Sequence, residues 1–165
     1  MTHSPDPILV LTTGGTIDKL YFDALDDYKI GDTIVDRLLQ RGRVAHPYRV
    51  QEVLKKDSLE LDDADRAAIL SAVLEAPEGR IVITHGTDTM TMTADALSGR
   101  SDKTIVLTGA LAPARMVESD APFNLGLAFA AAQTAPPGVW IAMSGSVFRA
   151  GEVVKDRGAG RFVAR

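Results

Sequence analysis

The sequence predicts an α/β fold in which a parallel sheet of about five strands is flanked by helices. Three observations support this prediction. The 165 residues are 45% hydrophobic, which is enough for one substantial core. Short runs rich in valine and isoleucine recur along the chain, as in strands buried on both faces of a parallel sheet. Helix patterns separate these runs, and such alternation is typical of β-α-β units.

The predicted strands are short apolar runs bounded by polar or turn-forming residues. They cover 8–12 (ILVLT), 48–54 (YRVQEVL), 80–84 (RIVIT), 104–108 (TIVLT) and 139–143 (VWIAM). Each gap between them is long enough for the crossover that a parallel pair of strands needs. The order therefore predicts a flavodoxin-like or Rossmann-like arrangement.

Four helix patterns fill these gaps. They run from Thr33 to near Gly42, from Asp62 or Asp63 to near Ala76, from Thr89 to Leu97, and from Ala121 to Gln133. Aspartate is a favoured helix cap, and Pro136-Pro137 would end the last helix. In that helix we expect the apolar residues to face the core; they are Phe123, Leu125, Leu127 and Phe129.

The carboxyl-terminal stretch after Val139 has a different pattern. Ser144-Gly145-Ser146 and Ala150-Gly151 are turn material between short strand-like pieces, which predicts a C-terminal β-hairpin. No repeat, low-complexity tract or linker divides the sequence. We therefore expect residues 1–165 to form a single α/β domain.

Composition excludes several classes of protein. The 18 basic and 22 acidic residues give a net charge of -4, so no broad positive field is available to bind nucleic acid. There is no cysteine and the three histidines are scattered, so we expect no metal site. We also expect no cofactor. The start of the chain lacks the features of a secretory signal, and no apolar stretch would span a membrane. We expect a cytoplasmic protein without membrane contact.

Polar residues follow four of the predicted strands. They occupy 13–16, 56–59, 85–89 and 109–110, and are rich in glycine, threonine, serine and aspartate. Because ligands bind beyond the carboxyl ends of parallel strands, these loops should share one rim. Turn formation and helix capping explain any one loop. Four on one edge favour a site that binds a small zwitterion with hydroxyls, backbone N–H groups and a carboxylate.

A phosphate-binding loop is not predicted at the first of these positions. The stretch GGTIDK, residues 14–19, lacks both the G-x-x-x-x-G-K-[ST] spacing and the G-x-G-x-x-G spacing. Gly158-Ala159-Gly160 has no helix after it, so we expect an exposed turn there.

Two stretches, TTGGTID (12–18) and VITHGTDTM (82–90), together resemble the two threonine signatures of the bacterial-type asparaginase family, which hydrolyses L-asparagine to aspartate and ammonia. The likeness continues through KKDSLELDDADR, VLTGALAPARMVESDAPFNLG and GEVVK, and so covers nearly the whole chain. The usual family member is longer and has a second, carboxyl-terminal domain. This chain resembles a short, single-domain form.

The resemblance implies a catalytic set. Thr16 matches the family's nucleophilic threonine, and Tyr21 matches the tyrosine on the mobile loop that closes over the substrate. Thr87 and Asp88 match the second catalytic threonine and its neighbouring acid. Lys155 matches the lysine that hydrogen-bonds that threonine. In the absence of the resemblance, the threonines could be turn or helix caps, and the lysine and tyrosine ordinary surface residues.

The resemblance also implies a substrate-binding set. It comprises Gly15, Asp57, Ser58, Leu59, Gly86 and Ala110. Ser58 matches the residue that grips the substrate carboxylate, whereas Leu59 stands where the family often has glutamine. The family's second domain lends a glutamate to the α-ammonium, which leaves Asp88 as the obvious carboxylate here. We therefore expect weaker substrate binding, and a homo-oligomer, because the missing domain would leave faces uncovered.

The chemistry requires a route for a proton. A threonine hydroxyl attacks an amide only when a base or a hydrogen-bonded chain takes its proton. A lysine accepts a proton only when neutral, which burial favours and a neighbouring carboxylate opposes. We expect attack by Thr16, loss of ammonia and hydrolysis of the acyl-enzyme near Thr87, with the Thr87 and Ala110 N–H groups facing the oxyanion.

The residues alone leave other functions and roles open. The chain could be a broader asparaginase-glutaminase, an amidase subunit that supplies ammonia to a partner, or a non-catalytic module that binds aspartate or asparagine. Which threonine attacks first is also open. His85 is expected to be structural, hydrogen-bonded beneath its loop. The acidic cluster at 62–65 is expected to start a helix and not to bind a cation.

Overall fold

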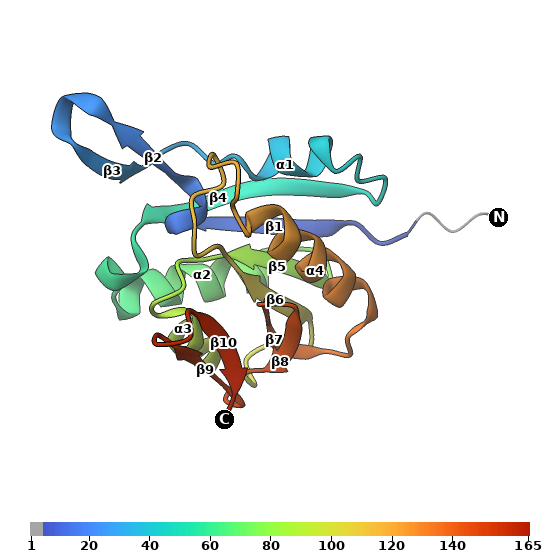
Figure 1. Ribbon diagram of the computed structural model, residues 1–165. Helices are drawn as coiled ribbons and strands as arrows, with labels where there is room; N and C mark the ends of the chain where they lie inside the picture. The colour runs from blue at the N-terminus through green and yellow to red at the C-terminus, as the bar shows by residue number, and fades with distance from the viewer. Residues whose placement is uncertain (1–4) are drawn as a thin grey trace.

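The computed structural model describes residues 5–165 and centres on a six-stranded sheet (Figure 1). Its strands are β1 (Ile8–Gly14), β4 (Tyr48–Lys56), β5 (Arg80–Thr84), β6 (Thr104–Thr108), β7 (Gly138–Met143) and β8 (Ser146–Arg149). The order across the sheet is β4-β1-β5-β6-β7-β8. The first five strands are parallel, and β8 pairs antiparallel with β7. The prediction of a parallel sheet of about five strands is confirmed.

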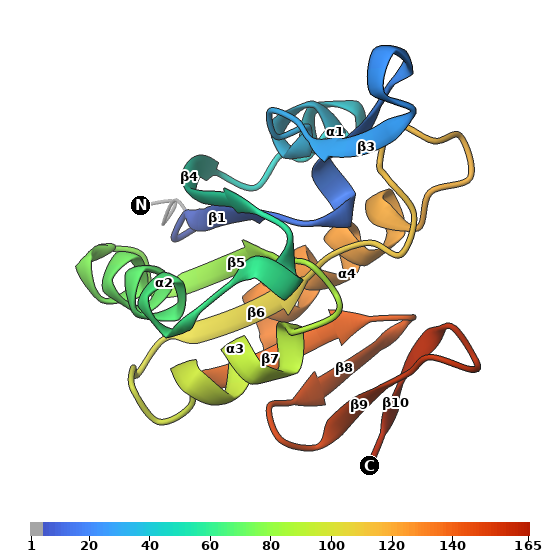
Figure 2. The ribbon, with the colours of Figure 1, turned by 90° about the vertical axis from the view of Figure 1, so that its left-hand side faces the viewer.

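Helices cover both faces of this sheet, as the turned view in Figure 2 shows. They are α1 (Val35–Arg41), α2 (Asp63–Glu75), α3 (Met90–Leu97) and α4 (Ala121–Thr134). Side chains of a strand point alternately to its two faces, so Ile8 and Val10 pack with α1 and α4, whereas Leu9 and Leu11 pack with α2 and α3. All four predicted helices are present, and their packing gives two apolar layers around the sheet.

Two sequence-based expectations of burial were wrong. Strand β4 is half exposed along much of its length because it lies at the edge of the sheet, with β1 as its one neighbour. Phe123 is 65% exposed, whereas Leu125 and Phe129 of the same helix are buried. Phe123 and Leu125 cannot share a helix face because successive residues are rotated by about 100°.

The carboxyl-terminal region contains two hairpins. Strands β7 and β8 are joined by Ser144 and Gly145, whose φ angles of 55° and 79° fit the two-residue turn that matches the strand twist. This confirms the predicted hairpin. A second hairpin, β9 (Val153–Asp156) with β10 (Arg161–Ala164), was not foreseen. It packs against the α2 and α3 face through Val153 and Phe162, and the exposed turn 158–160 lies at its tip.

A third hairpin projects from the carboxyl edge of β1, at the upper left of Figure 1. It consists of β2 (Lys19–Phe22) and β3 (Asp27–Ile30), preceded by the short 3₁₀ helix η1 (Thr16–Asp18) and closed by η2 (Asp23–Leu25). The rings of Tyr21 and Tyr28 face each other across it at a centroid distance of 5.3 Å. The sequence indicated only a loop here, because its alternation of apolar residues is short.

The part of the chain that the structure describes holds no helix long and apolar enough to cross a bilayer. His3 and part of the amino-terminal stretch that we assessed for a targeting signal lie in 1–4, outside the described residues.

Candidate functional site

Three polar loops meet backbone to backbone at the carboxyl edge of the sheet. A Cβ atom on Gly15 would lie 2.5 Å from the Gly86 nitrogen, and a Cβ on Gly86 would lie 2.5 Å from Ser58 Oγ. Gly15 also has a φ of 86°, a conformation that residues with a side chain rarely adopt. Glycine at these two positions therefore brings the loops after β1, β4 and β5 into one site.

A hydroxyl, an ammonium and a carboxylate form a hydrogen-bonded cluster at this edge. Lys155 Nζ, on β9, donates to Thr87 Oγ1 at 2.8 Å and to Asp88 Oδ1 at 2.9 Å. The Lys155 side chain is 19% exposed and that of Asp88 is 28% exposed. Arg157 Nη2 lies 3.3 Å from the same Asp88 oxygen. The cluster can pass a proton between Thr87 and the lysine while the carboxylate balances charge.

Ser58 belongs to the loop after β4 and packs against Gly86. Its side chain is 1% exposed, and its Oγ has no hydrogen-bond partner among the described residues. A buried hydroxyl without a partner is costly unless a ligand or water completes it. Ser58 Oγ is therefore available to donate to an anionic group that enters from the rim.

Asp57 and Leu59 flank that serine. Asp57 accepts the Leu59 N–H at 3.1 Å and forms an ion pair of 2.8 Å with Lys19, the first residue of β2. Burial raises the pKa of Asp57, but the bonds from Lys19 and the Leu59 N–H outweigh it and hold that pKa below its usual value. The Leu59 side chain is largely exposed and, being apolar, offers the site no hydrogen-bonding group.

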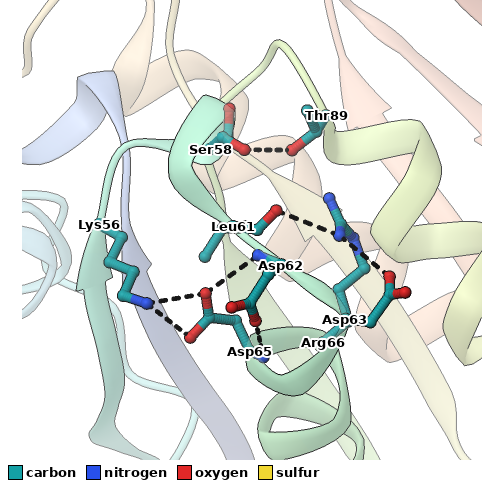
Figure 3. A network of polar contacts seen from close by, with 8 residues as sticks. All are labelled: Lys56, Ser58, Leu61, Asp62, Asp63, Asp65, Arg66 and Thr89. Atoms are coloured by element: carbon teal, nitrogen blue, oxygen red, sulfur yellow. Dashed lines mark hydrogen bonds and ion pairs between the residues drawn. The ribbon is translucent and has the colours of Figure 1, made fainter.

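The Ser58 loop is anchored from below, as Figure 3 shows. Thr89 Oγ1 donates to the Ser58 carbonyl at 2.8 Å, which ties this loop to the one that carries Thr87. Asp62 caps α2 in a reciprocal box with Asp65, and Lys56 Nζ binds Asp65 at 2.8 and 2.9 Å. The acidic cluster thus starts a helix, as the sequence indicated.

Thr16 lies just after β1, whereas Tyr21 lies on the projecting hairpin. Thr16 directly follows Gly15, is half-buried, and makes no side-chain hydrogen bond among the described residues. Tyr21 lies on the projecting hairpin, is 47% exposed, and donates its hydroxyl to Asp26. The hydroxyl of Tyr21 is therefore engaged within the hairpin and not with Thr16.

Asp18 sets the base of the projecting hairpin. Its buried carboxylate accepts the Ile34 N–H at 2.9 Å, and its carbonyl accepts the Gly31 N–H at 2.9 Å. Burial raises the pKa of Asp18, and the Ile34 N–H partly offsets that rise. Asp18 thus holds the two ends of the hairpin together at its base.

His85 is buried beneath the second threonine loop. Its ring bonds the Gly86 carbonyl through Nδ1 at 2.7 Å and Thr93 Oγ1 through Nε2 at 2.8 Å. Burial lowers the pKa of His85 to about 4, so the ring is neutral at pH 7. As expected from the sequence, this histidine is structural.

Ala110 lies in the loop that follows β6 and is buried. The preceding Gly109 is in close contact with His85, because a Cβ there would lie 2.3 Å from its carbonyl oxygen. Asn124, from α4, donates to the Gly109 carbonyl at 3.0 Å. These contacts hold the loop after β6 beside the loop that carries Thr87.

Sequence reasoning missed two charged residues of this rim. Lys19 pairs with Asp57, and Arg157 pairs with Asp88. The sequence could have indicated Arg157, because it lies two positions after Lys155 and residues at that spacing share a face of an extended chain. Among the described residues, no group of three His, Asp or Glu side chains is arranged to hold a metal ion.

The fold and this site define an open-sheet α/β protein with a hydroxyl, lysine and carboxylate cluster beyond the carboxyl ends of its strands. The family model described as "Asparaginase, N-terminal" matches residues 7–161. The chain therefore belongs to the asparaginase family.

Individual relatives agree with this assignment. An L-asparaginase of Thermococcus kodakarensis is 34% identical over 161 residues, which cover 93% of this chain and 48% of the relative. A glutaminase-asparaginase of Acinetobacter glutaminasificans is 30% identical, over 90% of this chain and 49% of its own. The solved thermostable L-asparaginase from Thermococcus kodakarensis matches 96% of this chain and 51% of its own, with a TM-score of 0.84 and 31% identity. The chain spans about half the length of these relatives.

Proposed function

We propose that this chain is an amidohydrolase domain that converts L-asparagine and water to L-aspartate and ammonia. The single observation that supports it most is the bond from Lys155 to both Thr87 and Asp88 at the rim. A ligand-binding module needs the carboxylate and the hydroxyls, but it has no need of a lysine bonded to a threonine.

The binding groups suit an amino acid with a side-chain amide. Ser58, with its unpaired buried hydroxyl, takes the α-carboxylate, and Asp88 takes the α-ammonium. The side-chain amide then faces Thr16 at the end of β1. Leu59 offers only its backbone, so the substrate loses one side-chain contact that many relatives have.

The proposed reaction has two steps. Thr16 Oγ attacks the amide carbon, its proton passes through the cluster to the leaving nitrogen, and ammonia departs from an ester of Thr16. Water then attacks the ester carbon and gives one proton to the cluster, which passes that proton to the Thr16 oxygen as the ester C–O bond breaks and aspartate leaves. The N–H groups of Thr87 and Ala110 are the candidate donors to the oxyanion.

The projecting hairpin provides the closing element. Tyr21 reaches Thr16 only after its hydroxyl leaves Asp26, so closure exchanges one hydrogen bond for another. A cavity of about 490 Å³ lies between the hairpin and the Ser58 loop, lined by Lys19, Asp57 and Leu59 among others. Closure would exclude water from the ester until ammonia has left.

The test is ammonia release from L-asparagine and L-glutamine by the wild type, Thr16→Ala and Thr87→Ala. Thr134→Ala is the matched control, because that hydroxyl bonds only the Ala130 carbonyl on the outer side of α4. We expect both site variants to lose turnover by orders of magnitude and the control to retain it. Wild-type turnover in both folded site variants would refute the proposal. Aspartate binding without ammonia release would favour a non-catalytic module.

A further inference from the structure

Arg157 is a second cation on the carboxylate of the site. Its Nη2 lies 3.3 Å from Asp88 Oδ1, and Lys155 Nζ lies 2.9 Å from the same oxygen. The two cations differ in burial, since the Arg157 side chain is 71% exposed and that of Lys155 is 19% exposed. Asp88 thus pairs with one largely buried cation, Lys155, and with one exposed cation, Arg157.

This cluster carries one positive charge in excess. Lys155 and Arg157 face the single carboxylate of Asp88, whereas the neighbouring Lys19 and Asp57 balance each other. An ammonium that approached Asp88 with both cations in place would meet two like charges. Withdrawal of one of them would relieve this repulsion when a substrate ammonium binds the carboxylate.

Arg157 is the cation that can leave at low cost. Lys155 is held by a second bond to Thr87 Oγ1, but Arg157 has no further ion pair among the described residues. It lies at the start of the exposed turn between β9 and β10, beside Gly158. A long, exposed side chain of this kind can move its charge into water with little loss.

We infer that Arg157 is a specificity-determining residue whose guanidinium occupies, before substrate binds, the place on Asp88 that the substrate's α-ammonium takes. This inference rests on the proposed function, in which Asp88 receives that ammonium. Asparagine must displace Arg157 to bind. An amide acid without the α-amino group, such as succinamate, leaves Arg157 in place. Arg157 therefore lowers the affinity for asparagine and leaves the affinity for succinamate unchanged, which narrows the difference between the two.

The test compares L-asparagine with succinamate in the wild type, Arg157→Gln and Arg157→Lys. In Arg157→Gln we expect the KM for asparagine to fall about three-fold, since an exposed ion pair is weak, while kcat and the KM for succinamate stay unchanged. Arg157→Lys should keep the wild-type KM because it keeps the charge. Arg161→Gln is the matched control, since Arg161 is exposed on β10 and forms no ion pair among the described residues.

Binding of the products separates this inference from the proposed function. Calorimetric titration with L-aspartate and with succinate does not depend on turnover. We expect Arg157→Gln to bind aspartate more tightly than the wild type does, with an unchanged affinity for succinate. A wild type that releases no ammonia would refute the proposed function, yet a selective gain for aspartate would still support the role of Arg157. Three outcomes would overturn that role: no gain for aspartate, parallel changes for both ligands, or a fall in kcat with both KM values unchanged.

Discussion

Lys155 donates a hydrogen bond of 2.8 Å to Thr87 Oγ1, although 68 positions separate the two residues in the chain. The lysine is on the hairpin of β9 and β10, and the threonine follows β5 in the centre of the sheet. Packing of Val153 and Phe162 against the α2 and α3 face holds that hairpin in place. The apolar core thus sets the position of the group that we propose to move protons.

Removal of this lysine should strongly reduce turnover without unfolding the chain. For Lys155→Met we expect kcat to fall about 100- to 10,000-fold, the usual contribution of a positioned proton-transfer group. Lys155→Arg should not restore activity, because a guanidinium does not give up its proton. Ammonia release measures kcat, and circular dichroism checks the fold. Wild-type kcat in Lys155→Arg would show that the site needs only a positive charge.

Ser58 should affect substrate binding more than catalysis. Its hydroxyl has no partner among the described residues, so Ser58→Ala removes no internal bond and should leave the melting temperature unchanged or higher. Loss of a bond to the substrate carboxylate should raise KM about 10-fold or more, with a smaller change in kcat. Ser71→Ala, on the exposed side of α2, is the control. A fall of kcat by about 10-fold in Ser58→Ala, with KM unchanged, would contradict this role.

Two glycines allow a steric test of the site. A methyl group on Gly86 would meet Ser58 Oγ at 2.5 Å, so Gly86→Ala should lower the free energy of unfolding by about 1–3 kcal/mol and impair binding. Gly126, on the exposed side of α4, has no atom within 4 Å of the same added group. Gly126→Ala should therefore stabilise the chain, by about 0.5–1 kcal/mol. Urea unfolding measures both, and an equal effect of the two substitutions would count against the packing described here.

His85 should make the fold sensitive to acid. Burial lowers the pKa of His85 to about 4 in the folded chain, whereas an unfolded histidine titrates near 6.5. Between these values the unfolded chain binds a proton that the folded chain does not. The free energy of unfolding therefore falls as the pH drops from 6.5 to 4, by about 3 kcal/mol for this group.

The measurement is urea unfolding of the wild type and His85→Gln at pH 7 and pH 4.5. Gln has no titrating ring, so the variant should start less stable at pH 7 but lose less stability on acidification. The remaining pH dependence reports the carboxylates, such as Asp65, whose pKa is lowered mainly by the bond from Lys56. Equal losses in the two proteins would show that His85 does not contribute.

We also expect the chain to associate with itself. Large apolar side chains are exposed near the start of α4, including Met116, Val117 and Phe123. Exposed apolar patches mark interaction sites in many proteins. Analytical ultracentrifugation at micromolar concentration should show a dimer or larger species. A species of only 17.6 kDa would contradict this expectation.

The sequence by itself determined the order of the five parallel strands and the four helices, and the edge of the sheet where the polar loops lie. The strands at 80–84 and 104–108 have the bounds that their apolar runs indicate, because a central strand of a parallel sheet must be apolar on both faces. Asp62 marks the start of α2 because its side chain caps the first turn. Such features depend on neighbouring residues, so a local pattern reveals them.

Only the tertiary structure decided which distant groups meet. Lys155 reaches Thr87 through the packing of a hairpin that the sequence did not predict, and Arg157 reaches Asp88 by the same route. The exposure of Phe123 and the bond from Tyr21 to Asp26 likewise depend on how α4 and the β2–β3 hairpin are oriented. A residue's own sequence neighbourhood does not specify these contacts, because they arise from the burial of apolar surface across the whole sheet.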